Sequence, residues 1–460
     1  MSKNEVEKAL SLANETKLLK LGENVLGEIA QIFKDQFPGK KGLIIADKNT
    51  YPKAGEAVHH HLSQADLEYA SPVIIDDPKL YAEYNFVQQI VPHLEPVDVI
   101  AIAVGSGVIN DLVKRASHEV DKPYMCVATA ASMDGYSAYG ASITKSGAKM
   151  TMECPAPRAI VADLAVMCDA PAVSNASGYA DLYAKVPAGA DWILADALGV
   201  ESIDSQSWHT VQDGLAHALQ YPEGVKSGDI AAIKPLTEGL MLAGFAMQSL
   251  QSSRPASGAE HQFSHLWDME HHTFKGEMAK IYGLYKDRDE QAPSHGFKVG
   301  IGTLTVIALY ERIFETPLDQ LDVDKAVSQW KPLEEQIAEV NEMFTEEGPR
   351  LFSLKQVSDK YISKERLKEQ LTVLKNNWPE IQEKLKKQLT PYEETKKRLE
   401  LTGAPVTCEQ IGITKDRLRE SFYKAHKLRS RFTVLDVAYR TGYFDKWIDE
   451  LFADGGVLAI

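Results

Sequence analysis

Short apolar runs alternate with amphipathic, helix-period segments over the first 170 residues. The runs at 42–47, 71–76, 98–104 and 124–130 predict strands. The run at 98–104 is almost entirely apolar, as expected of a strand that is covered on both faces of a sheet. Strands that alternate with helices are typical of a parallel sheet with helices packed on it. We therefore expect an α/β domain in this part of the chain.

The pattern becomes helical after about residue 170. The segments at 180–198 and 231–250 are rich in alanine and leucine, and the segment at 367–385 carries an apolar stripe at helical spacing. We expect a nucleotide-binding α/β domain over residues 1–170 and an all-α domain over residues 171–460.

Composition narrows the classes of function. The chain has 65 acidic and 50 basic residues, a formal net charge of −15. This balance argues against a nucleic-acid partner, because nucleic-acid affinity depends on basic surface. It does not exclude small anionic substrates, because these need only a local basic pocket. The charged segment at 351–400 is interpreted as the solvated face of a helical bundle.

Cysteine usage and the absence of long apolar runs indicate the compartment. The four cysteines are widely spaced and form no CxxC pair, so neither a disulfide framework nor a thiolate metal site is expected. The N-terminus lacks the apolar core of a signal peptide, and no uninterrupted apolar run has the length of a membrane span. We expect a cytoplasmic protein without a membrane partner.

A glycine-containing turn follows the most apolar strand. Gly105, Ser106 and Gly107 stand between the strand at 98–104 and an amphipathic helix. Glycines let the backbone approach a ligand, and a helix N-terminus after the turn offers N–H groups to a pyrophosphate. Asn110 stands where the last glycine of the dinucleotide fingerprint would be. A turn that uses glycine for steric reasons alone therefore remains an alternative.

Histidines concentrate between residues 254 and 296. His261 and His265 are spaced so that both rings lie on one side of a helix, and His295 follows. Imidazole suits zinc, iron or nickel, and a carboxylate such as Asp181 would complete a site. The alternative is that these are surface histidines and a capping aspartate. The triplet at 59–61 points in three directions around a helix and is interpreted as surface.

Several of these segments together resemble the sn-glycerol-1-phosphate dehydrogenases. These enzymes belong to the superfamily of iron-containing alcohol dehydrogenases, glycerol dehydrogenases and dehydroquinate synthases. The strings SMDG (132–135) and SRPASGAEH (253–261) are the most specific. The other matching strings are GSGVINDLVK (105–114), GYADLYAK (178–185), HGFKVGIGTL (295–304) and RSRFTVLDVAYRTGYFD (429–445). The resemblance runs in order across nearly the whole chain and implies a dehydroquinate synthase-like fold.

The resemblance also implies roles for individual residues. Asp181, His261 and His295 match the metal ligands, and His265 matches a second active-site histidine. Asp134 matches a substrate-contacting aspartate. The residues that match the cofactor site are Gly105, Ser106, Gly107, Asp111, Thr129 and Ser132.

Asp47 bears on the choice of cofactor. It follows the first predicted strand, where a carboxylate accepts hydrogen bonds from ribose hydroxyls and repels a 2′-phosphate. This favours NAD, while NADP stays open because the family contains NADP users. The alternative is a simple strand-end turn residue.

The expected activity is the metal-dependent, NAD(P)-linked interconversion of dihydroxyacetone phosphate and sn-glycerol 1-phosphate. The expected cofactors are NAD and one divalent ion (zinc, nickel or iron), and the family resemblance favours a homodimer. A dehydrogenase of an unphosphorylated polyol and a non-catalytic nucleotide-binding protein are the alternatives. The candidates for holding the substrate phosphate are Arg254, Lys145 and Lys149. A long segment, residues 266–294, separates the two metal histidines. Because of it, the sequence does not predict which residues form the rim of the site or which substrate the rim selects.

Overall fold

The chain forms two compact units, each assembled from segments that are discontinuous in sequence. The computed structural model describes residues 3–65 and 67–459. The first unit comprises Met1–Lys145, Lys149–Leu182 and His209–Ser253, and the second comprises Ser146–Ala148, Tyr183–Trp208 and Arg254–Ile460. These units are defined by packing. The division into functional domains at residue 170 therefore stays a prediction.

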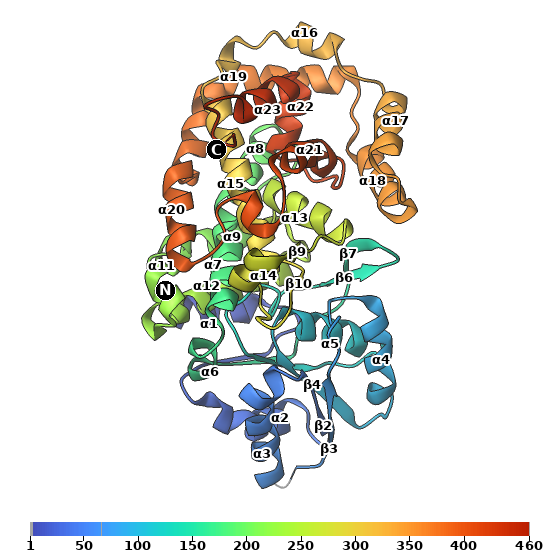
Figure 1. Ribbon diagram of the computed structural model, residues 1–460, viewed down its shortest axis with the longest axis vertical. Helices are drawn as coiled ribbons and strands as arrows, with labels where there is room; N and C mark the ends of the chain where they lie inside the picture. Colours follow the sequence, from blue (N-terminus) through green and yellow to red (C-terminus); the bar gives the residue numbers. More distant parts are fainter. Residues whose placement is uncertain (1–2, 66, 460) are drawn as a thin grey trace. The chain divides into compact units, whose positions relative to one another are not determined.

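A six-stranded sheet forms the centre of the first unit (Figure 1). Its strand order is β1-β8-β5-β4-β2-β3, and every pairing is parallel. The strands are β1 (Leu18–Gly22), β2 (Lys41–Asp47), β3 (Tyr69–Ile75), β4 (Val99–Gly105), β5 (Met125–Ala128) and β8 (Ala159–Asp163). The predicted parallel α/β architecture is confirmed.

Helices cover both faces of this sheet. On one face, α2 (Ile29–Gln36) and α3 (Glu56–Gln64) enclose an apolar core with side chains of β2, β4, β5 and β8. On the other face, α4 (Tyr84–Leu94) and α5 (Gly107–Glu119) pack against each other and on β4. All residues of β4 are buried, which explains why its sequence is continuously apolar instead of alternating.

The sequence pattern missed two strands of the sheet and a hairpin. The edge strand β1 is short and contains a lysine, and β8 is a five-residue run without helical or alternating periodicity. The hairpin pairs β6 (Ala141–Lys145) with β7 (Ala148–Met152). Such short strands depend on their neighbours for burial, so local pattern is a weak guide to them.

The direction in which strands are added reverses between β2 and β4. From β2 the chain adds β3 on one side, and then returns to add β4 and β5 on the other. In open α/β sheets, ligands bind outside the carboxyl ends of the strands at such a reversal. Asp47 ends β2 and Gly105 ends β4, so two predicted cofactor residues flank this point.

The remaining helices of the first unit surround an apolar helix, α12 (Ile230–Leu250). Among the described residues this helix alone is long and apolar enough to cross a membrane, yet 78% of its apolar window is buried inside the protein. It therefore packs as a core helix. Its neighbours include α1 (Lys3–Leu12), α6 (Leu164–Cys168), α10 (Leu215–Ala218) and α11 (Pro222–Ser227). Helix α7 (Ala172–Tyr183) also belongs to the first unit, except for its last residue.

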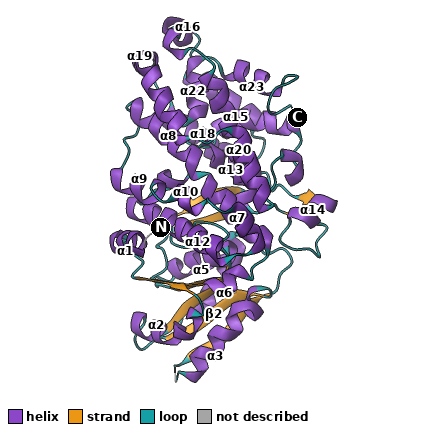
Figure 2. Cartoon of the chain, turned by 90° about the vertical axis from the view of Figure 1, so that its left-hand side faces the viewer, coloured by secondary structure: helices purple, strands orange, loops and turns teal. Residues whose placement is uncertain are grey.

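The second unit is almost entirely helical, as predicted (Figure 2). Its central helices are α8 (Lys185–Ala197), α13 (Ala259–Met269) and α15 (His295–Phe314). Between α13 and α15 the chain forms the short β9–β10 pair (Phe274–Lys275 and Glu290–Gln291) and α14 (Gly276–Tyr282). The C-terminal helices are α16 (Val323–Ser328), α17 (Leu333–Met343), α18 (Glu347–Lys360), α19 (Lys364–Gln388), α20 (Tyr392–Thr402), α21 (Lys415–His426), α22 (Val434–Thr441) and α23 (Phe444–Phe452).

Candidate metal and cofactor sites

Two of the predicted metal ligands lie side by side in the second unit. His261 is in the first turn of α13, and His295 is the first residue of α15. Their ring centroids are 5.4 Å apart, and a ligand nitrogen of one ring lies within 4.8 Å of one of the other. His265, one turn after His261, has its ring centroid 6.3 Å from that of His261. The predicted histidine cluster is therefore formed.

A glycine brings the two histidine-bearing helices together. A Cβ at Gly302 of α15 would lie 2.4 Å from the carbonyl oxygen of Glu260 in α13. Only a residue without a side chain allows this approach of two helix backbones. Ser294 caps α15, because its side-chain oxygen accepts from the N–H of Phe297. Local sequence thus fixes the start of α15, where His295 stands.

Glu260 orients the ring of His261. Its Oε1 accepts from the backbone N–H of Gly258 at 2.6 Å and lies 2.7 Å from Nδ1 of His261. Glu260 is completely buried, and burial raises the pKa of its carboxyl group to about 7. A proton on Nδ1 that is donated to this carboxylate leaves the lone pair on Nε2, which is the tautomer that binds metal ions. The sequence reasoning missed this residue, although it directly precedes a predicted ligand.

We expect Glu260→Gln to weaken divalent metal binding by about 10- to 100-fold, the effect usual for a group that orients a metal ligand. The glutamine amide keeps the shape of the glutamate side chain, but it has no carboxylate to accept the hydrogen bond from Nδ1 of His261. Metal affinity measured by competition with a chelator checks this. Glu277→Gln, on the exposed surface of α14, is the matched control. Equal affinity in both variants would show that Glu260 does not orient His261.

Asp191 ties the start of α13 to the rest of the second unit. Its two carboxylate oxygens accept from Ala259 N at 2.7 Å and Val434 N at 2.8 Å, and Tyr310 donates its hydroxyl at 2.6 Å. Asp191 is fully buried, and burial, together with the nearby Glu260, raises its pKa to about 7. These bonds fix the N-termini of α13 and α22 relative to each other.

His265 contacts an arginine that the sequence reasoning did not select. Nη2 of Arg429 lies 2.9 Å from Nε2 of His265. Because a guanidinium can only donate, Nε2 accepts and the ring proton is on Nδ1. Burial and the charge of Arg429 lower the pKa of His265 well below its usual value. The neutral ring is therefore the form present at pH 7.

The predicted carboxylate ligand and the predicted substrate contact lie together in the first unit. Asp181 is a fully buried residue of α7, and its Oδ2 accepts from the backbone N–H of Asp134 at 3.0 Å. The loop that carries Asp134 also contacts α7 at Asn175, whose Oδ1 accepts from Ala131 N at 3.0 Å. The two aspartates are thus held by one packed unit of loop and helix.

The predicted cofactor residues gather at the carboxyl ends of neighbouring strands. Gly105 ends β4, Ser106 precedes α5, and Gly107 begins that helix. Thr129 follows β5, and its N–H donates to the carbonyl oxygen of Gly105 at 3.3 Å. Asp111 lies in α5, and its carboxylate accepts from the backbone N–H of Ser142 at 3.3 Å. Ser132 lies in the loop after β5, and its hydroxyl is 3.2 Å from that of Tyr136. The turn therefore has a strand-end position suited to a dinucleotide.

A buried lysine, Lys114, holds the loop that bears Ser132 and Asp134. Its ammonium group donates to three carbonyl oxygens, at Gly135 (2.9 Å), Ala138 (2.8 Å) and Gly140 (3.0 Å). Its side chain is completely buried. A charged donor with three backbone acceptors fixes the loop conformation. Lys114 lies in the matching string GSGVINDLVK (105–114), but the sequence reasoning assigned it no role.

We expect Lys114→Met to destabilise the protein by about 3 kcal/mol, because three buried carbonyl oxygens lose a donor and each loss costs about 1–3 kcal/mol without full additivity. Urea unfolding followed by circular dichroism measures the change. The control is Lys34→Met, which alters an exposed lysine of α2 in the same unit. A loss no larger than that of the control would contradict the structural role of Lys114.

Asp47 forms a turn at the end of β2. Its Oδ1 accepts from the backbone N–H groups of Asn49 at 2.7 Å and Thr50 at 2.9 Å. This is the strand-end turn that the sequence left as an alternative. A contact with the ribose of a cofactor is not tested by these bonds and stays a prediction.

The candidates for holding the substrate phosphate have other partners. Arg254 is fully buried and donates to the carbonyl oxygens of Asp191 and Phe432, with Glu201 3.2 Å from its Nε. It therefore serves the packing of the second unit. The ammonium groups of Lys145 and Lys149 lie over the rings of Tyr84 and Tyr81, at 3.8 and 5.0 Å from the ring centroids.

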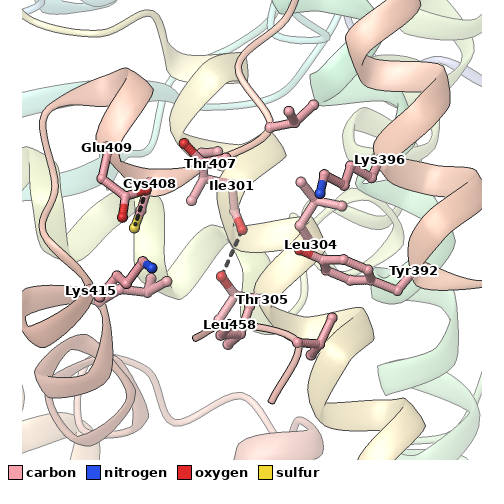
Figure 3. Close-up of a pocket in the computed structure, with 13 residues that line it drawn as sticks. Ile301, Leu304, Thr305, Tyr392, Lys396, Thr407, Cys408, Glu409, Lys415 and Leu458 are labelled. Atoms are coloured by element: carbon pink, nitrogen blue, oxygen red, sulfur yellow. Dashed lines mark hydrogen bonds between the residues drawn. The ribbon is translucent and has the colours of Figure 1, made fainter. Parts of the chain in front are cut away.

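A separate small cavity of about 40 Å³ lies in the second unit between Tyr392, Cys408 and Lys415 (Figure 3). This volume suits a few waters and is too small for a triose phosphate. Burial and the neighbouring Glu409 raise the pKa of the Cys408 thiol to about 12, so the thiol stays protonated at neutral pH. The cavity has neither the size nor the chemistry of a substrate site.

Comparison with known proteins places this chain among dehydrogenases. A family model described as iron-containing alcohol dehydrogenase matches residues 20–171. The chain is 28% identical over 429 residues to a glycerol-1-phosphate dehydrogenase [NAD(P)+] of Halalkalibacterium halodurans, covering 92% of this chain and 93% of the relative. An archaeal protein of the same name, from Methanoregula boonei, is 32% identical over 63% of this chain and 73% of its own length.

Solved structures support the fold. The glycerol dehydrogenase of Schizosaccharomyces pombe matches with a TM-score of 0.56 at 15% identity, covering 96% of this chain and 91% of that one. A sulfoacetaldehyde reductase from Bifidobacterium kashiwanohense, solved with NAD+, matches with a TM-score of 0.54 at 13% identity, covering 94% and 97% of the two chains. The resemblance seen in the sequence motifs is confirmed by the relatives with higher identity: the chain belongs to the glycerol-1-phosphate dehydrogenase family.

Proposed function

We propose that this protein interconverts dihydroxyacetone phosphate and sn-glycerol 1-phosphate, with NAD(P) as the hydride carrier and one divalent metal ion. The observation that carries the proposal is the pair of imidazoles on α13 and α15, 5.4 Å apart, in a chain of this family. The relatives named glycerol-1-phosphate dehydrogenase cover most of the chain, which supports the same substrate class here.

His261, His295 and Asp181 are the residues we propose for holding the metal. The imidazole pair and the Glu260 contact on Nδ1 of His261 fit this role, because they provide nitrogen ligands in a fixed tautomer. Asp181 contributes a buried carboxylate. Zinc, nickel and iron all suit this donor set. When bound, a divalent ion acts as a Lewis acid toward a ketone or alcohol oxygen.

The first unit provides the proposed site for the cofactor. The turn at Gly105–Gly107 and the N-terminus of α5 suit the pyrophosphate, since helix N-termini favour anions. Asp111, Thr129 and Ser132 would line the site. We infer a preference for NAD over NADP from the carboxylate of Asp47, which would repel a 2′-phosphate.

Two polar groups would act on the substrate. Asp134 would accept a hydrogen bond from a substrate hydroxyl and so orient the carbon that exchanges hydride with the nicotinamide. Nδ1 of His265 is buried, and no described residue is its hydrogen-bond partner. Since Arg429 fixes its proton on this nitrogen, His265 would donate a hydrogen bond to a substrate oxygen while remaining neutral.

A panel of substrates and cofactors tests the proposed function. Protein of measured metal content is given NAD or NADP with either sn-glycerol 1-phosphate or glycerol. We expect a clear preference for the phosphate ester and for NAD. Equal turnover of glycerol would favour a polyol dehydrogenase, and inert protein without metal would favour a non-catalytic binding protein. Light scattering in the same buffer tests the homodimer that we propose, and fractionation of cells tests the cytoplasmic location.

A further inference from the structure

Arg429 differs in its partners from Arg254 and Lys298, two buried cations of the second unit. Arg254 has Glu201 beside it, and Lys298 forms an ion pair with Asp268. Across residues 3–65 and 67–459, Arg429 has no carboxylate partner, and its one hydrogen bond is to Nε2 of His265. The Arg429 side chain is partly buried. A partly desolvated guanidinium without an anionic neighbour is stabilised when a ligand supplies the negative charge.

The surroundings of Arg429 increase the local positive charge. Arg431 stands two residues along the same loop, and its Nη1 donates to the carbonyl oxygen of Ser257 at 2.7 Å. Burial lowers the pKa of Arg429, and burial together with the charge of Arg429 lowers that of Arg431 to about 9. Two cations that disfavour each other's charge form a place where an anion is stabilised.

The position of this loop is fixed by the helices on both sides. It joins α21 to α22, and α22 begins with a capping box formed by Thr433 and Asp436. The N–H of Val434 is held by the buried carboxylate of Asp191, which also holds the first residue of α13. The loop that carries Arg429 is therefore anchored, at its C-terminal end, to the same buried carboxylate that holds the start of α13.

Arg429 also lies at a suitable place relative to the histidine pair. His265 is between them: its ring centroid is 6.3 Å from that of His261, and its Nε2 is 2.9 Å from Nη2 of Arg429. A triose phosphate has its reacting oxygen on the central carbon and its phosphate on the neighbouring carbon. A molecule with its oxygen near the histidine pair and hydrogen-bonded to His265 would extend its phosphate toward this arginine.

We propose that the guanidinium of Arg429 binds the phosphate group of the substrate and so sets the preference for a phosphorylated triose over a free polyol. This inference rests on the proposed function and adds the residue that recognises the phosphate. The planar fork of donors on arginine matches two phosphate oxygens at once. Arg429 is the specificity-determining cation in place of Arg254, Lys145 or Lys149.

Arg429→Gln tests the proposal, with Arg417→Gln as the matched control. Arg417 also contacts a histidine ring, since its Nη1 lies 2.7 Å from Nδ1 of His272, but its second partner is the carboxylate of Glu270. With protein of equal metal content, we expect Arg429→Gln to lower kcat/KM for sn-glycerol 1-phosphate by about 100-fold, mainly through KM, because a charge-assisted pair with phosphate is lost. The KM for NAD and the values of the control should stay within about threefold of wild type.

Binding of inorganic phosphate, measured by calorimetry on the metal-loaded protein, gives a second readout that does not depend on turnover. With NAD present in excess to occupy the proposed pyrophosphate site, we expect phosphate to bind to wild type and to Arg417→Gln, but not to Arg429→Gln. If phosphate binding and the KM for the ester are unchanged in Arg429→Gln, or if the KM for NAD rises instead, the assignment of Arg429 is wrong. If Arg429→Gln does not fold, Arg429→Lys is used, which keeps the charge and loses the fork.

The wild-type enzyme separates this inference from the proposed function. A wild type that does not prefer the ester over glycerol contradicts the proposed function. Phosphate binding that disappears in Arg429→Gln would in that case still identify Arg429 as an anion-binding residue. A wild type that prefers the ester, together with a variant that keeps this preference, contradicts the inference alone.

Discussion

His261→Ala is expected to lower turnover by at least about 1000-fold while the protein stays folded. The substitution removes one of the two imidazoles that face each other on α13 and α15. Metal ions stabilise a developing alkoxide by several kcal/mol, and each 1.36 kcal/mol corresponds to a factor of ten in rate. Steady-state assays with sn-glycerol 1-phosphate and NAD, together with metal analysis, measure the effect.

The histidine triplet offers a matched control for this experiment. His60→Ala removes an exposed imidazole from α3 and should leave both metal content and turnover unchanged. His261 is 6% exposed, and the groups around its ring are polar. Thermal melting is therefore recorded to show that the variant keeps its fold. Retained turnover in His261→Ala with full metal content would remove His261 from the set of ligands.

Gly178→Ala is expected to disrupt the first unit at the place where Asp181 is held. A Cβ on Gly178 would lie 1.8 Å from the carbonyl oxygen of Ala131, so α7 would have to move away from the loop that bears Asp134. Overpacking of this kind costs about 1–3 kcal/mol, and contact with backbone places it at the upper end or beyond. We expect a loss of about 3 kcal/mol in the free energy of unfolding and a large fall in turnover.

Gly27→Ala is the control for the chemical change. Apart from its chain neighbours and its own helical turn, no atom lies within 4 Å of a Cβ built on Gly27, which is exposed in the same unit. Urea unfolding of both variants compares the two sites, and turnover is measured in parallel. If Gly178→Ala is as stable and active as Gly27→Ala, α7 does not pack on Ala131 as closely as described.

The architecture could be predicted from sequence where burial imposes a clear pattern. Strand β4 is covered on both faces and reads as a continuous apolar run, and α12 is apolar throughout because it is a core helix. Strands β1 and β8 were missed, because each is short and acquires its place from its neighbours in the sheet. Local pattern carries little information about such pairings.

The sequence also predicted only some of the residues of the candidate site. Motif strings pointed to His261 and His295, and the structure brings these two together. Motifs did not point to Glu260, Lys114 or Arg429 as functional residues, because each acts through a partner distant in space or through a neighbour's ring nitrogen. Arg254 was chosen as a phosphate ligand because it lies in a specific motif. In the structure its guanidinium is buried beside Glu201 in the core of the second unit. Charge in a motif does not say which groups surround it.

The reduction of dihydroxyacetone phosphate by metal-loaded protein tests the central claim most directly. NADH oxidation is followed at a known metal content, and the product is analysed with a method that distinguishes the two enantiomers of glycerol phosphate. We expect metal-dependent oxidation of NADH and formation of sn-glycerol 1-phosphate. Metal-loaded protein that does not reduce the ketone, or that forms the opposite enantiomer, would contradict it.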